Sequence, residues 1–360
     1  MFCRVSAVVG AVCIALGVSG CAPALPSPSP KTSRSATSTA APTPDATQSA
    51  NPASSPSLLD FTTQTVLLPE FHELAPPWEE LFTLPYGDGE DRLGTSPGGE
   101  GLEWGPSYGT QLPDGTWWFL DTANFRLAHF DEGGSYLGDA PLPEEHLAQG
   151  EFLQWQSPQA LADGTVVLQS TTPDRPGMLR LAPDGTFSRV ELDRFPGLKG
   201  TDGTSLFGFD EDGRPVVVDP ADGLLAQVDS FVGQGGLSYF VEAEPGSVSV
   251  QLGDLALPIP LEAADHPDAL VYPSIEAATG TDGVLTLLVS GIAEVETGVA
   301  VDASAVLRID AAGAGTVEPV PMLTSEADPG DGARLGIRLG DDRPWLMAVD
   351  ADALRVYRRG

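Results

Sequence analysis

The densest group of side chains able to do chemistry stands in the segment DTANFR, residues 121 to 126. It places Asp121, Asn124 and Arg126 within six positions, between two short apolar runs. A carboxylate, an amide and a guanidinium held together can bind a polar ligand. Short polar side chains also hydrogen-bond to nearby backbone and so hold tight turns. We predict the turn-holding role for these three residues, with ligand binding as the alternative.

Other patterns for catalysis are weak. The segment from Gly105 to Gly109 reads G-x-S-x-G, but no helix pattern follows Ser107, as a nucleophile elbow requires. The spacing of the histidines matches no zinc-binding motif. We predict no catalytic residue and leave the ligands of any metal unassigned. The four histidines are His72, His129, His146 and His266.

Acidic residues dominate the charge of the chain. It has 51 Asp and Glu against 18 Lys and Arg, for a formal net charge of -33, which disfavours nucleic acid and anionic lipid as partners. Two local clusters carry the oxygen ligands that calcium prefers, yet both lie in Gly-containing turns where acidic residues are common. We predict no cofactor, with calcium as the alternative. The clusters are Asp88, Glu90 and Asp91, and Asp210, Glu211 and Asp212.

The N-terminus has the layout of a secretory signal. Arg4 precedes an apolar run from Val5 to Val18 that is too short to stay as a membrane-spanning helix. The run ends in Val18-Ser19-Gly20-Cys21, which resembles the lipobox of bacterial lipoproteins. That resemblance implies cleavage before Cys21, attachment of a diacylglycerol to its thiol, and the acyl chains (palmitate) of a lipid anchor.

A polar tether follows. In residues 22 to 57, 30 of 36 positions are Ala, Pro, Ser or Thr, a composition that buries too little apolar surface to fold. We therefore predict a signal peptide at 1–20, a lipidated cysteine and disordered tether at 21–57, and one folded domain at 58–360.

Turn spacing within that domain indicates a repeat. Asp-Gly pairs at 114–115, 163–164 and 212–213 are each separated by 49 residues, and another stands at 282–283. Asp-Gly between alternating apolar runs is a strong hairpin signal. A four-stranded meander cannot bury both of its faces alone, whereas radial stacking of such sheets does so. We predict an all-β chain that forms a single β-propeller, with six blades favoured and seven as the alternative.

The expected leading strands place two Trp residues near a central channel. A sixth blade is expected from 335 to 358 plus an N-terminal strand between 61 and 85, either FTTQTVLL or WEELFTLPY, which closes the ring. Trp104 and Trp155 are expected in the core, with a channel-mouth binding role as the alternative. The first five leading strands are expected near Trp104, Trp155, Leu206, Leu237 and Tyr272.

The first blade resembles the NHL repeat of β-propellers. That repeat runs from a Gly-Pro start through Asp-Gly, a β run, Asp-x-x-Asn-x-Arg and a Phe-Asp turn. Later blades keep only the turns and the strand spacing. The resemblance implies the propeller fold, and it implies that Asp121 and Asn124 hold a turn while Arg126 pairs across the blade. The matching residues are Gly105, Pro106, Asp114, Gly115, Asp121, Asn124, Arg126, Phe130 and Asp131.

These observations favour a non-enzymatic role. We expect a monomeric binding or scaffolding module on the outer face of the cell membrane of an actinobacterium-like organism, contacting a protein, peptide or glycan of the envelope. One alternative is a hydrolase or lyase, similar to propeller lactonases, with a divalent metal in the central channel. Another is an accessory to a membrane complex. Fold alone does not choose among them.

Overall fold

Turns capped by Asp side chains divide the chain into short strands. The computed structural model describes residues 58–68, 78–97, 103–104, 108–144, 155–170, 175–194, 196–233, 236–281, 283–294, 300–319, 333–337, 344–349 and 352–360. In the turn at Asp114, its Oδ1 accepts the backbone N–H of Thr116 at 3.0 Å, while Gly115 takes a φ of 94°. Asp163 and Gly164 repeat this geometry. The sequence therefore places Asp and Gly where a hairpin turn needs a side-chain acceptor and a positive φ.

The described strands form six sheets of four or five strands and one sheet of two. Strands that follow one another in sequence pair antiparallel, so each larger sheet is an up-and-down meander. The first three sheets contain β6 (Gly109–Gln111), β7 (Trp117–Asp121), β8 (Arg126–Phe130) and β9 (Tyr136–Pro141); β10 (Trp155–Ala160), β11 (Val166–Ser170), β12 (Gly177–Leu181) and β13 (Phe187–Glu191); and β14 (Gly197–Thr201), β15 (Leu206–Phe209), β16 (Pro215–Val218) and β17 (Leu225–Gln227).

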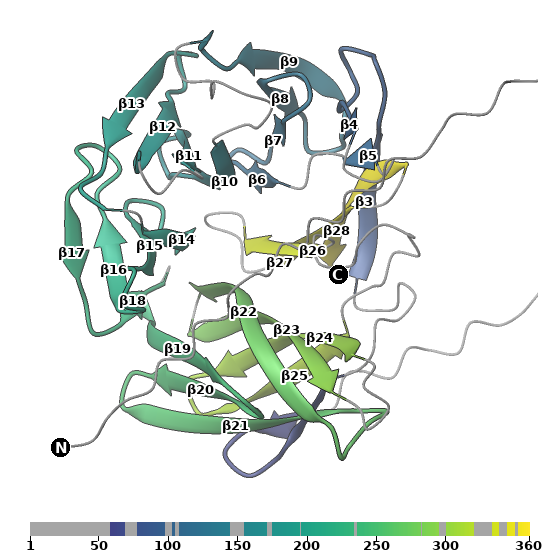
Figure 1. The fold of residues 1–360 in the computed structure, drawn as a ribbon, viewed down its shortest axis with the longest axis vertical. Coiled ribbons are helices and arrows are strands. Elements are labelled where there is room, and N and C mark those ends of the chain that lie inside the picture. The colour runs from purple at the N-terminus through teal and green to yellow at the C-terminus, as the bar shows by residue number, and fades with distance from the viewer. Residues whose placement is uncertain are drawn as a thin grey trace, which may run out of the picture. The chain divides into compact units, whose positions relative to one another are not determined.

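The later sheets are built from longer strands and from N-terminal additions. Figure 1 shows the long strands β22 to β24 in green. These sheets contain β18 (Phe231–Val232), β19 (Ser238–Glu244), β20 (Ser247–Leu252) and β21 (Leu255–Ala263) with β2 (Val66–Leu68); β22 (Leu270–Thr281), β23 (Val284–Glu294), β24 (Ala300–Asp310) and β25 (Ala314–Pro319) with β1 (Leu59–Asp60); and β26 (Ala333–Ile337), β27 (Pro344–Val349) and β28 (Ala353–Arg359) with β3 (Trp78–Pro85). The two-stranded sheet pairs β4 (Ser96–Pro97) with β5 (Glu103–Trp104).

Successive meanders of this kind are the blades of a β-propeller, so the predicted fold class is confirmed. All described residues belong to one compact unit, in which β6 contacts β10, β10 contacts β14, β22 contacts β26, and β26 contacts β6. The number of blades and the closure of the ring stay predictions. The part of the chain that is described holds no helix long and apolar enough to cross a membrane.

The N-terminal strands join three different sheets. β3 supplies the fourth strand beside β28, with Leu84 opposite Leu354, so WEELFTLP and not FTTQTVLL takes that place. β2 lies parallel to β21 and β1 lies antiparallel to β25. Sequence analysis did not predict these last two pairings.

Three leading strands lie elsewhere than predicted. Trp104 belongs to β5, and β6 begins the sheet assigned to it. Leu206 lies in β15, the second strand of its sheet. The turn Asp202-Gly203 joins β14 to β15, and the repeat spacing did not reveal it. Leu237 precedes β19, another second strand. The Asp-Gly pair at 212–213 joins the second and third strands of its sheet, so its spacing of 49 residues does not mark an equivalent turn.

Aromatic side chains fill the contact between two sheets. One is the sheet of β26 to β28 with β3, called the last sheet below, and the other is the sheet of β6 to β9. Trp117 of β7 meets Trp345 of β27 edge to face at 5.2 Å between ring centroids, and Phe82 of β3 meets Trp117 at 5.7 Å. All three rings are less than 8% exposed. Each buried aromatic residue stabilises the fold by about 1.5 to 3 kcal/mol, so N-terminal and C-terminal strands are held to this sheet by burial.

Candidate functional site

The predicted polar cluster lies at the turn between β7 and β8. Asp121 ends β7 and pairs across the ladder with Arg126, which begins β8. Phe125, between them, has a φ of 51°, a left-handed conformation that costs energy for a residue other than Gly. Its side chain is 39% exposed. The turn thus carries local backbone strain that the surrounding contacts must offset.

Asp121 is the centre of the cluster, and its carboxylate is fully buried. Oδ1 accepts the backbone N–H groups of Gly94 at 3.1 Å and Asn124 at 3.3 Å. Oδ2 accepts Asn124 Nδ2 at 2.8 Å and Arg126 Nε at 2.9 Å. Both oxygens are therefore engaged by protein donors, as a buried charge requires.

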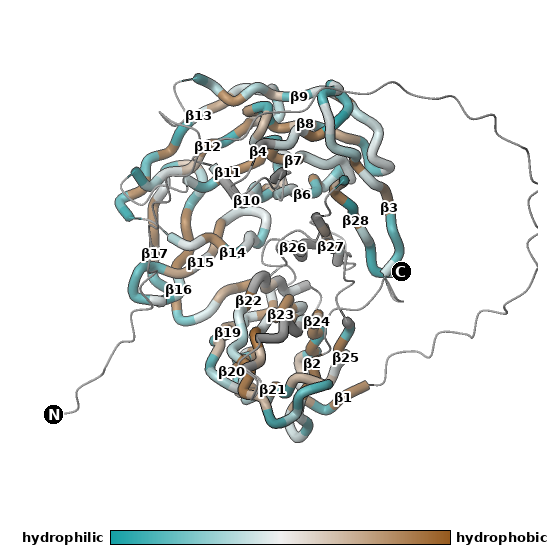
Figure 2. The backbone as a smooth tube through the Cα atoms, turned by 45° about the vertical axis from the view of Figure 1, so that its right-hand side comes forward, coloured by the Kyte–Doolittle hydropathy of each residue, from teal (hydrophilic) through white to brown (hydrophobic). Residues whose placement is uncertain are grey.

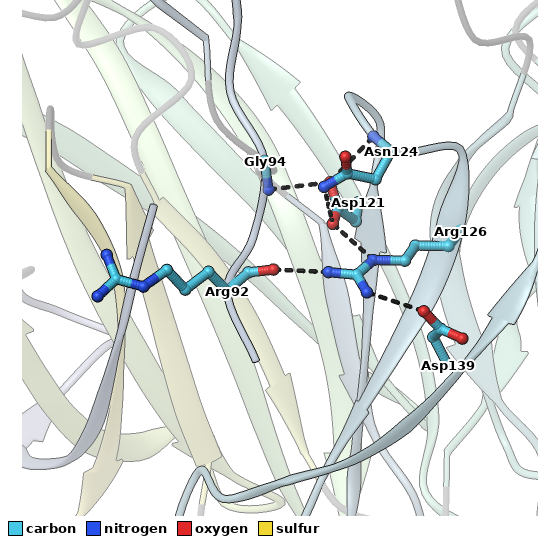
Figure 3. A network of polar contacts seen from close by, with 6 residues as sticks. All are labelled: Arg92, Gly94, Asp121, Asn124, Arg126 and Asp139. Carbon is cyan, nitrogen blue, oxygen red and sulfur yellow. Dashed lines mark hydrogen bonds and ion pairs between the residues drawn. The ribbon is translucent and has the colours of Figure 1, made fainter. Parts of the chain in front are cut away.

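Arg126 extends the cluster to two other segments. Its Nη1 donates to Asp139 of β9 at 2.8 Å, and its Nη2 donates to the carbonyl of Arg92 at 2.6 Å. Burial alone lowers the pKa of Arg126, but the hydrogen bonds to Asp139 and Asp121 outweigh it and raise that pKa above its ordinary value. The guanidinium is thus a permanent cation held by two carboxylates. Figure 3 shows all these contacts.

The segment from Arg92 to Gly94 comes from outside the blade. It follows β3, a strand of the last sheet. A Cβ at Gly94 would lie 2.5 Å from Nδ2 of Asn124 and 2.9 Å from Cβ of Ala123, so only Gly lets this segment approach the turn. The cluster is therefore a clamp: Asp121, Asn124 and Arg126 fasten the chain after β3 onto the sheet of β6 to β9.

Sequence analysis missed Asp139, Arg92 and Gly94. Asp139 lies in β9 opposite Ala128, two residues along the ladder from Arg126, and the strand pattern did not predict this register. The backbone groups of Arg92 and Gly94 carry no pattern in the sequence, because a carbonyl or N–H is present at almost every residue.

Gly94→Ala tests the clamp. We expect a loss of about 1 to 3 kcal/mol in the free energy of unfolding, because the new methyl group overpacks against Ala123 and Asn124. Thermal melting measures it. Gly133→Ala is the control, since a Cβ there meets only Asp131 Oδ1, at 3.6 Å. Equal melting temperatures for the two variants would contradict the close approach.

A second pair of rings lies on the same sheet. His129 of β8 stacks on Trp118 of β7, with ring centroids 4.2 Å apart and planes within 2°. Burial lowers the pKa of His129, and the charge of Asp114 opposes this only in part. Burial thus favours the neutral form of the imidazole, which packs flat against the ring of Trp118.

The structure describes some of the remaining predicted site residues and not others. Asp114 and Gly115 form the β6–β7 turn described above. Trp155 is 2% exposed, packs with Leu120 and Leu168, and lies 5.6 Å from the guanidinium of Arg189, so its ring offers no free surface. Trp104 lies in β5, and its side chain is not described. Gly105, Pro106, Val18, Ser19, Gly20 and Cys21 lie outside the described residues.

The acidic clusters show no metal geometry where the chain is described. In those segments, no group of three or more His, Cys, Asp or Glu side chains is arranged to hold a metal ion. Asp210 instead caps its own turn, accepting the backbone N–H groups of Asp212 at 3.0 Å and Arg214 at 2.9 Å.

The fold and the clamp define an all-β, propeller-type domain. Over residues 76–359 the chain matches the family model described as a domain of unknown function (DUF7485), and it belongs to this family. A search of curated proteins found no match.

Solved structures resemble the chain at low identity. Virginiamycin B lyase from Staphylococcus aureus is 13% identical, with 78% of this chain and 99% of that chain covered and a TM-score of 0.43. Regucalcin from Agrobacterium tumefaciens, described as a calcium-binding protein, is 12% identical, with coverage of 82% and 97% and a TM-score of 0.38. A putative exported protein from Bacteroides fragilis is 12% identical, with coverage of 82% and 99% and a TM-score of 0.42. At these values, nothing about the activity of this chain follows.

Proposed function

We propose that this chain is a lipoprotein of the extracytoplasmic face of the cell membrane. Its propeller acts as a monomeric binding or scaffolding module for a protein, peptide or glycan of the envelope. The observation that carries the proposal is the order along the chain: an apolar run, the tetrapeptide ending at Cys21, a tether rich in Ala, Pro, Ser and Thr, and then the β domain.

The tether suits such a role by its length. Its 36 residues, 22 to 57, reach on the order of 110 Å if extended as polyproline II, at about 3.1 Å per residue. A domain held on such a tether can meet partners well above the membrane surface. The net charge of -33 opposes direct adsorption to anionic headgroups, so the lipid on Cys21 supplies the attachment.

The polar groups of the clamp are used within the protein. Both oxygens of Asp121 and three nitrogens of Arg126 bond to other groups of the protein. A catalytic carboxylate or guanidinium must reach a substrate. This cluster instead fastens one segment of chain to another, and we assign it no cofactor.

Cys21→Ala tests the anchor. In an actinobacterial host, we expect wild-type protein in the membrane fraction and the variant in the soluble fraction or the medium, since no thiol remains to carry the lipid. Immunoblots of separated fractions measure the distribution. Cys13→Ala, within the predicted signal, is the matched control and should stay in the membrane fraction. A Cys21→Ala variant that remains membrane-bound at the wild-type level would overturn the proposal.

A further inference from the structure

The segment from Leu58 to Leu68, which holds β1 and β2, docks onto the later sheets as a ligand would. Figure 2 labels β1 and β2 beside the strands β21, β24 and β25. β1 is a fifth strand on the sheet of β22 to β25, and β2 is a fifth strand on the sheet of β18 to β21. β2 makes the only parallel pairing between named strands in the described parts of the chain. Without this segment each of the two sheets has four strands, as the three sheets that precede them along the chain do.

Three apolar side chains hold the segment. Phe61 is 1% exposed, while Val66 and Leu68 are fully buried, and all three belong to the core shared by these two sheets. The side chains between them point away, with Leu67 53% exposed. Burial of three such side chains on one face, with backbone pairing along the strand, is the pattern by which extended peptides add to sheet edges.

The acceptor surface contacts this segment at both of its ends. The carbonyl oxygen of Gly313 accepts a hydrogen bond from the N–H of Phe61 at 2.9 Å. A Cβ at Gly313 would lie 3.1 Å from Cγ2 of Thr62. A Cβ at Gly315 would clash first with the backbone carbonyl of Arg308 in its own sheet, and it would also lie 3.0 Å from Cε2 of Phe61. At the other end, the carbonyl of Leu68 accepts the N–H of Ala264 at 2.9 Å. Gly313 takes a φ of 83° in the turn between β24 and β25, so both glycines serve their own sheet as well as contacting the segment.

The segment also carries its own turn. Asp60 Oδ1 accepts the N–H of Thr62 at 3.0 Å, and Gln64 Oε1 accepts the N–H of Asp60 at 2.8 Å. These side-chain bonds lie within the segment, so it reaches the acceptor with part of its conformation set. In addition, the family match begins at residue 76, after the segment ends.

We propose that residues 58–68 are a separable docking strand, and that the surface formed by β21, β25, Gly313 and Gly315 is a binding site for an extended peptide with the spacing Phe-x4-Val-x-Leu. The occupant is this segment of the same chain. Covalent attachment gives the cis segment an effective concentration on the order of millimolar, so it masks the site in the intact protein.

The test uses the full chain with a weakened segment. In the double variant Phe61→Ala/Leu68→Ala, a fluorescent peptide of residues 58–68 should bind at least about tenfold more tightly than it binds wild-type protein, as measured by anisotropy. The change removes two of the three buried side chains of the cis competitor. Thermal melting and near-UV circular dichroism establish that the variant is folded.

Two peptide variants sharpen the result. A peptide with Phe61→Ala should lose at least about tenfold in affinity, whereas one with Leu67→Ala, whose side chain is exposed in the docked segment, should bind as the unchanged peptide does. The proposal is overturned if the folded double variant fails to bind the peptide. It is also overturned if the double variant loses its cooperative thermal transition, because the segment would then be an integral part of the core.

Discussion

Asp121→Ala should destabilise the domain by about 3 to 5 kcal/mol, because it leaves the Arg126 guanidinium buried without its inner carboxylate. It also frees the N–H of Gly94 and the Nδ2 of Asn124. At roughly 2 to 4 °C per kcal/mol, the melting temperature should fall by about 6 to 20 °C. Differential scanning calorimetry of residues 58–360, compared with the full chain, measures the loss.

Asp139→Ala is the matched control. It removes the outer of the two carboxylates that contact Arg126. The side chain of Asp139 is 32% exposed, so water can solvate the Nη1 of Arg126 once that carboxylate is gone. We expect a loss of no more than about 1 kcal/mol. If both variants lose the same stability, Asp121 is not the centre of the clamp. A smaller loss for Asp121→Ala than for Asp139→Ala would contradict the account outright.

Arg359→Met should destabilise the domain by a similar amount, at the contact between β28 and β25. Arg359 ends β28 and contacts Glu318 of β25 through Nε at 2.9 Å and through Nη2 at 2.8 Å. Glu318 is fully buried. Loss of the guanidinium leaves that carboxylate without its cation, at a cost of about 3 to 5 kcal/mol. Urea unfolding at neutral pH measures it.

Two further variants separate the ion pair from general damage to β28. Glu318→Met/Arg359→Met removes both charges and should recover most of the loss, since replacing a buried pair by apolar residues is often neutral. Arg355→Met, whose contact with Glu80 is 3.5 Å long and partly exposed, should cost less than about 1 kcal/mol. A double variant less stable than Arg359→Met would show that packing, not charge, governs this contact.

The sequence predicted the fold where local chemistry decides it. Asp-Gly turns and alternating apolar runs led to the meanders, because a side-chain acceptor and a positive φ are set by the turn residues themselves. The two equal spacings of 49 residues misled, because Asp-Gly suits any hairpin turn of a blade. Asp202-Gly203 is the first turn of its sheet, and Asp212-Gly213 is the second.

Long-range pairing was harder to predict. The sequence left two candidate segments for the fourth strand of the last sheet, and β3, which lies in the second of them, forms that strand. The pairings of β1 and β2 were missed, since two or three residues carry no alternation that can be recognised. Burial of Phe61 in a distant core decides them.

The candidate site was predicted in its centre and missed at its edge. Asp121, Asn124 and Arg126 were identified from their spacing, and the structure brings Asn124 and Arg126 within hydrogen-bond distance of Asp121. The segment that they hold, from Arg92 to Gly94, was not foreseen. Its contacts are made by backbone groups and by the absence of a side chain at Gly94.

The mass of the intact mature protein tests the central claim most directly. Protein extracted from membranes of an actinobacterial host should begin at Cys21 and carry the added mass of a diacylglyceryl group on that residue. Tandem mass spectrometry of the N-terminal fragment would locate the lipid. A mature chain that begins at another residue, or an unmodified Cys21 in membrane-extracted protein, would contradict a lipid-anchored binding module.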